Sequence, residues 1–286
     1  MNYLLLFISI VFAVANSILF HKREALENKM NPFMFNGVGA VVWIAVLVLI
    51  NRGRLCLNHN TVLYGIMYGT VQILFLFFKL KAMETGPVSV TTLIGNCSMV
   101  FSVIVSMIIW NEPVGVMQWA GIAILLLGIA AASEIKKADG YKRLWSFYVV
   151  GFFILAGIVG IVFKLFSATE NHRHYTDMFI IAAAFMAVCN FAVSSTYAKK
   201  ERTVYNKTDW RYALLCGVVC CVYNRLNAFL AGALPGVIFF PVFNGSVIIL
   251  SAAAGVVLCK ERLKKRQLWG FVMGAVALLF IGKVIV

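Results

Sequence analysis

Arg225 lies inside an apolar segment of about residues 210 to 230, fourteen residues after Arg211. An ionised group in hydrocarbon costs several kcal/mol unless it is paired or hydrated, so such a residue by default faces a polar cavity. Its neighbours Tyr223 and Asn224 add a hydroxyl and an amide. A guanidinium in this setting suits an anionic group, which it can bind through paired hydrogen bonds. A structural salt bridge is the alternative, but the eleven acidic residues fall in loops or near the ends of apolar segments.

Asn96 and Asn244 place the same amide at matching positions of two other apolar segments. A side-chain amide in hydrocarbon needs a hydrogen-bonding partner, which a neighbouring helix, water in a cavity or a substrate can supply. The sequence leaves two interpretations open: bonding between helices, and lining of a transport pathway.

These residues must be positioned by membrane-spanning helices. Hydrophobic residues make up 62% of the chain and charged residues only 13%, and about 20 apolar residues cross a bilayer as a helix. The segments are continuously apolar rather than alternating, which favours helices over a barrel. We therefore predict an all-α polytopic membrane protein with ten transmembrane helices. The segments are approximately residues 2–20, 33–50, 62–80, 88–109, 115–133, 145–166, 178–197, 210–230, 235–258 and 267–286.

One pattern of residues occurs twice in the sequence, and the two copies are 148 to 149 residues apart. Two related halves that rock against each other are typical of transporters with a central site. We predict two five-helix repeats, 1–134 and 144–286, joined by a cytoplasmic connector at 135–143. Because each repeat has an odd number of spans, the two copies insert in opposite orientations. The repeated residues are Pro87, Asn96, Ser98, Glu112, Gln118 and Gly121, then Pro235, Asn244, Ser246, Glu261, Gln267 and Gly270.

The repeated Glu, Gln and Gly residues fall between one span and the next, where a structural role is the favoured interpretation. Glu can cap the start of a helix, and Gly lets two helices approach closely. Gly270 and Gly274 form a G-x-x-x-G face on the last span. Packing is again favoured for this face, with a homodimer as the alternative.

The net charge of +14 is distributed unevenly over the loops. Loops after the odd-numbered spans carry 19 Lys and Arg residues, and the opposite side carries 5. The positive-inside rule places the 19 in the cytoplasm and both termini outside. We expect an integral protein of a bacterial cell membrane whose partners are the lipid bilayer and a small-molecule substrate, with no nucleic acid.

Motifs for catalysis and cofactor binding are missing from the sequence. It has no Gly-rich phosphate loop, no HExxH and no nucleophile elbow, so we expect no enzyme, no catalytic residue and no cofactor. The seven cysteines show no paired spacing and are interpreted as small apolar side chains. His172 and His174 lie in a short polar loop, where solvation is favoured over zinc binding.

The segment Trp110–Gly121, with its duplicated E-x5-Q-x2-G, resembles the EamA-type members of the drug/metabolite transporter superfamily. The resemblance implies ten helices in two repeats and alternating access around a central cavity lined mainly by helices 1, 3, 4, 6, 8 and 9. Candidate substrate-binding residues on these helices are Asn16, Gln72, Asn96, Tyr223, Asn224, Arg225 and Asn244.

Two features depart from this resemblance. The related small four-helix drug exporters use a carboxylate in the first helix for proton coupling, whereas the first helix here holds Asn16 and no acid. Exchange, facilitated diffusion or coupling by another route is therefore favoured. The charge distribution also places the termini outside, while several family members are thought to keep them inside.

These patterns favour secondary transport of a small polar metabolite. Since the deep polar residues are amides and one cation, we expect an amino acid or an organic anion that carries a carboxylate or phosphate. One alternative is efflux of lipophilic drugs, for which a cavity with an arginine is poorly suited. The other is a non-transporting membrane scaffold subunit, in which the Asn and Arg residues would lie at helix contacts without a cavity.

Overall fold

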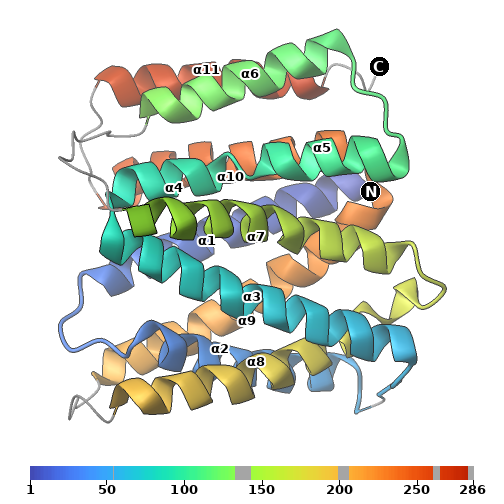
Figure 1. Cartoon of the computed structure of the whole chain (residues 1–286), viewed down its shortest axis with the longest axis vertical. Coiled ribbons are helices and arrows are strands. Elements are labelled where there is room, and N and C mark those ends of the chain that lie inside the picture. The colour runs from blue at the N-terminus through green and yellow to red at the C-terminus, as the bar shows by residue number, and fades with distance from the viewer. Residues whose placement is uncertain (54, 133–142, 199–205, 260–264, 283–286) are drawn as a thin grey trace. The chain divides into compact units, whose positions relative to one another are not determined.

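The computed structural model describes residues 1–53, 55–132, 143–198, 206–259 and 265–282, and these residues are almost entirely helical (Figure 1). The predicted all-α class is therefore confirmed. Glu261 and residues 135–142 of the predicted connector lie outside the described residues. The helices are α1 Asn2–Glu24, α2 Pro32–Ile50, α3 His59–Thr85, α4 Val88–Asn96, α5 Met99–Trp110, α6 Val116–Ala132, α7 Arg143–Ser167, the 3-10 helix η1 His172–His174, α8 Tyr175–Ala198, α9 Lys207–Ala233, α10 Gly236–Cys259 and α11 Lys265–Gly282.

Within the described residues, eight helical segments are long and apolar enough to cross a membrane. One of them, Val90–Trp110, contains a break between α4 and α5 where a single helix was predicted. The two other apolar helices, Val116–Ala131 in α6 and Leu268–Ile281 in α11, are shorter than the eight. Each predicted segment thus corresponds to helix over most of its described length, with the one internal break between α4 and α5. The arrangement in two inverted repeats stays a prediction.

The chain forms two compact units, each built from two separate stretches of sequence. The first unit comprises residues 1–73 and 162–230, and the second comprises 74–161 and 231–286. In the first unit, α2 and α8 pack along each other, and α6 and α11 do the same in the second unit (Figure 1). Each unit therefore combines parts of both predicted repeats.

In the first unit, small residues let α3 approach α8 closely. A Cβ atom on Gly65 would lie 2.8 Å from the Met178 carbonyl oxygen, and one on Gly69 would lie 3.1 Å from that of Ala182. Gly65 and Gly69 are one helical turn apart, so they form a single flat face on α3. This approach places the aromatic side chains of α3 deep in the first unit.

A buried ion pair joins the end of α1 to the start of α9 in the same unit. Arg23 Nε donates to Asp209 Oδ1 at 2.6 Å, and both side chains are at least 95% buried. The second carboxylate oxygen accepts from the Met30 backbone N–H at 2.6 Å. Arg23 also lies over the Phe35 ring, 3.9 Å from its centroid. These contacts fix the loop between α1 and α2.

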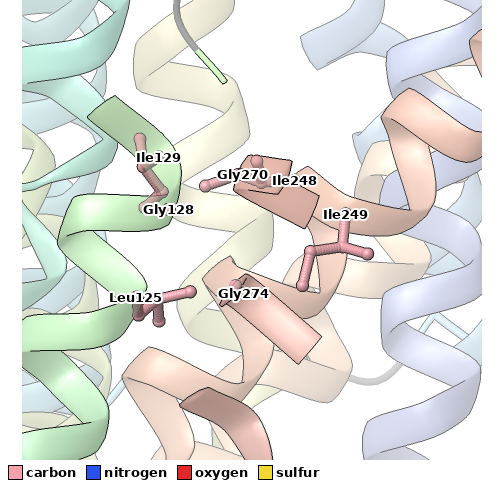
Figure 2. A pocket seen from close by; sticks show the side chains of 8 residues that line it. Leu125, Gly128, Ile129, Ile248, Ile249, Gly270 and Gly274 are labelled. Carbon is pink, nitrogen blue, oxygen red and sulfur yellow. The ribbon is translucent and has the colours of Figure 1, made fainter. Parts of the chain in front are cut away.

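In the second unit, α6 and α11 meet through glycines. A Cβ atom on Gly128 would lie 2.8 Å from the Gly270 carbonyl oxygen and 3.1 Å from the Gly274 nitrogen. Figure 2 shows the small apolar pocket beside this contact, lined also by Leu125, Ile248 and Ile249. The G-x-x-x-G face is therefore used for packing inside the chain, as favoured from the sequence, and a homodimer through it stays a prediction.

The first copies of the repeated Glu and Gln also have structural contacts. Glu112 Oε2 accepts a hydrogen bond from the Val237 N–H at 3.2 Å, in the first turn of α10. Gln118 Oε1 accepts from the Gly115 N–H at 2.9 Å, next to the start of α6. A carboxylate or amide oxygen at these positions satisfies N–H groups that have no partner within the helix. Glu112 thus caps the start of α10.

Candidate functional site

Polar side chains of α1, α3 and α9 gather inside the first unit. The hydroxyl of Tyr68 on α3 lies 2.6 Å from Gln72 Nε2 and 3.2 Å from Asn224 Oδ1 on α9. Asn224 Nδ2 in turn donates to the Cys220 carbonyl oxygen at 2.9 Å. This chain of hydrogen bonds joins two helices whose bonded residues are 156 positions apart in the sequence.

A second group of contacts brings α1 to the same place on α9. The Cys220 thiol lies 3.2 Å from Asn16 Oδ1 and 3.7 Å from the hydroxyl of Tyr223. The two groups are connected through Cys220, whose carbonyl oxygen accepts from Asn224 and whose thiol lies beside Asn16 and Tyr223. We call these six residues the polar cluster: Asn16, Tyr68, Gln72, Cys220, Tyr223 and Asn224.

The polar cluster adjoins a tightly bonded anchor between α1 and α9. The Ser9 hydroxyl donates to Asn227 Oδ1 at 2.6 Å and lies 3.3 Å from the Tyr223 carbonyl oxygen. Ser9 and Asn227 are both buried, and each fills one hydrogen-bonding position of the other. In the polar cluster, by contrast, Asn16, Gln72 and Tyr223 are only partly buried and stay open to further contacts.

The members of the polar cluster are amides, phenols and a thiol, and none of them is ionised at neutral pH. Together they offer both donors and acceptors inside helices that are otherwise apolar. Hydrogen bonding to a polar solute suits such a group, whereas proton abstraction or nucleophilic attack would need a base that it lacks. Among the described residues, no group of three or more His, Cys, Asp or Glu side chains could hold a metal ion.

Four of the seven predicted site residues meet in the polar cluster: Asn16, Gln72, Tyr223 and Asn224. Arg225 makes its side-chain hydrogen bond outside the polar cluster. Its side chain is exposed, and its Nε donates to Thr176 Oγ1 at 3.1 Å, in the first turn of α8. The predicted contact of this guanidinium with an anionic group stays a prediction.

The other two predicted residues belong to the second unit. Asn96 is the last residue of α4, directly before the break at Cys97 and Ser98. Asn244 lies in α10 and donates its Nδ2–H to the Phe240 carbonyl oxygen at 2.8 Å, next to Pro241, which interrupts the helical hydrogen bonding. Both segments therefore deviate from a regular helix close to the repeated Asn.

Tyr68 and Cys220 were not predicted as site residues. Aromatic residues are common in the packing of membrane proteins, and the cysteines, Cys220 among them, were interpreted as small apolar side chains. A usable signal existed in their spacing, because residues three or four apart lie on one helical face. Tyr68 with Gln72 and Cys220 with Tyr223 and Asn224 have this spacing.

Comparison with known proteins supports the class of protein that these features define. The EamA-like transporter family model matches residues 1–133. The comparison with curated proteins found no match. Among solved structures, one crystal structure aligns with a TM-score of 0.74 and 14% sequence identity, covering 99% of this chain and 98% of that chain. At this identity the likeness concerns the fold.

Polar side chains inside apolar spans often mark the pathway of a solute. The EamA-like match over residues 1–133 covers nearly all of the first predicted repeat, 1–134. The resemblance predicted from the repeated motif is confirmed, and it indicates a membrane transporter of the drug/metabolite type.

Proposed function

We propose that the protein is a secondary transporter that binds a small polar metabolite in the polar cluster and moves it across the membrane by alternating access. The observation that carries the proposal is the hydrogen-bonded chain from Gln72 through Tyr68 to Asn224, with Asn16 beside it. Polar side chains in a span are expensive unless they bond to each other or serve a pathway. The partly buried members of the polar cluster suit a pathway.

The proposed architecture is ten transmembrane helices in two inverted repeats, 1–134 and 144–286, with the connector 135–143 and both termini outside. Pairing of α2 with α8 and of α6 with α11 supports it, because in each pair the partners hold the same position in their repeats. An inverted pair of this kind can alternate between two related arrangements around a fixed site.

The proposed substrate is an amino acid or an organic anion. The neutral members of the polar cluster suit the polar groups of either. An anion would gain a charged partner if Arg225 left Thr176 and turned toward Asn224, its neighbour in sequence. Asn96, Arg225 and Asn244 are therefore proposed as further substrate contacts, separate from the polar cluster.

Counterflow in proteoliposomes tests this function without knowledge of a coupling ion. Purified protein is reconstituted into vesicles that contain one unlabelled metabolite, and entry of the same labelled metabolite is followed, over pools of amino acids and organic acids. We expect saturable accumulation of at least one solute. A scaffold subunit would give protein-containing vesicles that match empty ones for every pool, and accumulation of lipophilic drugs alone would favour efflux instead.

A further inference from the structure

The donor and the acceptor of each hydrogen bond from Cys220 to Tyr68 can be assigned, starting from one backbone carbonyl group. The carbonyl oxygen of Cys220 can only accept, so the Asn224 atom at 2.9 Å from it is the amide nitrogen. The other end of this amide, Oδ1, then faces the Tyr68 hydroxyl at 3.2 Å. Because Oδ1 can only accept, Tyr68 donates its single proton to Asn224.

The direction continues to Gln72. With its proton given to Asn224, the oxygen of Tyr68 can only accept from the group 2.6 Å away, so Gln72 directs its Nε2–H at Tyr68. The carbonyl oxygen of Gln72 then points away from Tyr68. Among the described residues, none donates a hydrogen bond to this oxygen, and the Gln72 side chain is partly exposed. Gln72 thus offers an acceptor to a solute.

Packing around the ring of Tyr68 holds its hydroxyl in place. The side chain is fully buried. Its ring stacks on Phe163 at a centroid distance of 5.0 Å and meets the edge of Phe179 at 5.4 Å. Gly65 and Gly69 on either side of it hold α3 against α8, as described above. Several independent contacts therefore place the hydroxyl between Gln72 and Asn224.

We propose that Tyr68 is a positioning residue that fixes the Gln72 carbonyl oxygen as the acceptor for an N–H group of the substrate. This inference rests on the proposed transport function and narrows the substrate to molecules that carry an amino or ammonium group. If Gln72 turned over, it would offer N–H donors, which suit carboxylate and hydroxyl oxygens. Tyr68 opposes that orientation, because the Gln72 carbonyl oxygen and the Tyr68 oxygen, two acceptors, would then have to face each other.

Removing the Tyr68 hydroxyl, whose proton sets the direction of these hydrogen bonds, should change the selectivity for amino-bearing solutes more than it changes folding. Tyr68→Phe keeps the buried ring and deletes only the hydroxyl. Tyr64→Phe is the matched control, since Tyr64 lies one turn earlier on α3 and packs its ring against Phe166 at 5.7 Å. A hydrogen bond to a charged donor corresponds to roughly 10- to 100-fold in affinity.

The experiment compares each amino-bearing solute with its deamino analogue, in which hydrogen replaces the amino group. Labelled α-amino acids are tested one by one in counterflow, and the deamino acids are added as competitors. For the unaltered protein and for Tyr64→Phe, we expect the amino form to be favoured at least about 10-fold. For Tyr68→Phe, the preference should fall toward one, with a raised KM for the amino form and a smaller change in maximal rate.

The outcomes separate this inference from the proposed function. Transport with an unchanged amino preference in Tyr68→Phe, or transport of organic acids but of no amino-bearing solute, overturns the inference and leaves transport intact. If the unaltered protein shows no counterflow of any solute, both the inference and the proposed function are overturned. If Tyr68→Phe does not fold, Gln72→Met takes its place, because it keeps the length and removes the acceptor; an undiminished amino preference in that variant also overturns the inference.

Discussion

Replacing Asp209 with Ala should destabilise the first unit strongly, because it leaves a cation buried without its counter-charge. The carboxylate accepts from Arg23 Nε at 2.6 Å, from Arg23 Nη2 at 3.3 Å and from the Met30 N–H at 2.6 Å. Without it, Arg23 keeps the Met30 carbonyl oxygen at 2.8 Å and the Phe35 ring. Removing one partner of a buried ion pair costs about 3–5 kcal/mol.

Glu24 provides the matched control on the same arginine. Its carboxylate lies 3.9 Å from Arg23 Nη1, and its side chain is 64% exposed. Exposed pairs contribute about 1 kcal/mol or less, since water screens them. Glu24→Gln should therefore change stability far less than Asp209→Ala, although both remove one carboxylate next to Arg23.

The measurement is unfolding in mixed micelles of increasing SDS fraction, followed by circular dichroism for the unaltered protein and each variant. A double variant, Arg23→Met with Asp209→Leu, identifies the cause, because an apolar pair of similar volume removes the stranded charge. We expect it to recover most of the loss. If Asp209→Ala lies within about 1 kcal/mol of the unaltered protein, or if the double variant is the least stable, the reasoning is wrong.

Three further predictions concern packing, topology and charge. Gly128→Val should force α6 away from Gly270 and cost about 1–3 kcal/mol in the same unfolding assay, while Gly115→Ala, whose Cβ would meet only a Gln118 oxygen at 4.0 Å, should be nearly neutral. Cys56, in a cysteine-free background, should react with an impermeant thiol reagent in intact cells; labelling only after lysis would reverse the orientation. Arg225→Gln should weaken uptake of an anionic solute without loss of stability. Thr176→Val removes the same hydrogen bond and should leave this uptake unchanged. An equal effect of the two variants on uptake would mean that Arg225 acts through its contact with α8.

The helices were predictable because the bilayer imposes a simple rule on sequence. About 20 apolar residues are needed for each crossing, and such segments stand out regardless of which helices they contact. Helix ends were less accurate: α3 spans His59–Thr85 and α9 spans Lys207–Ala233, several residues beyond the predicted segments, since helices continue past the hydrocarbon. The break after Asn96 had no clear signal, because neither Cys97 nor Ser98 is a helix breaker.

The candidate site was predictable only in part. Amides such as Asn224 attract attention in an apolar segment, because lipid cannot satisfy them. Tyr68 does not attract attention, because a tyrosine in an apolar segment is equally common as a packing residue. Its role depends on a contact with a residue 156 positions away, which no local pattern reveals. The position of Arg225 along its helix could be counted from the sequence. The residue that its side chain contacts could not be predicted in this way.

The central claim, that the polar cluster binds a transported solute, is tested most directly by one pair of variants in counterflow. Asn224→Ala breaks the hydrogen-bonded chain inside the polar cluster. Asn36→Ala removes a similar amide on α2 that also donates to the carbonyl oxygen four residues earlier, at 2.7 Å, outside the polar cluster. We expect Asn224→Ala to lower the counterflow rate at least about 10-fold and Asn36→Ala to leave it within about twofold of the unaltered protein. Equal rates for the two variants, at equal amounts of folded protein, would contradict the claim.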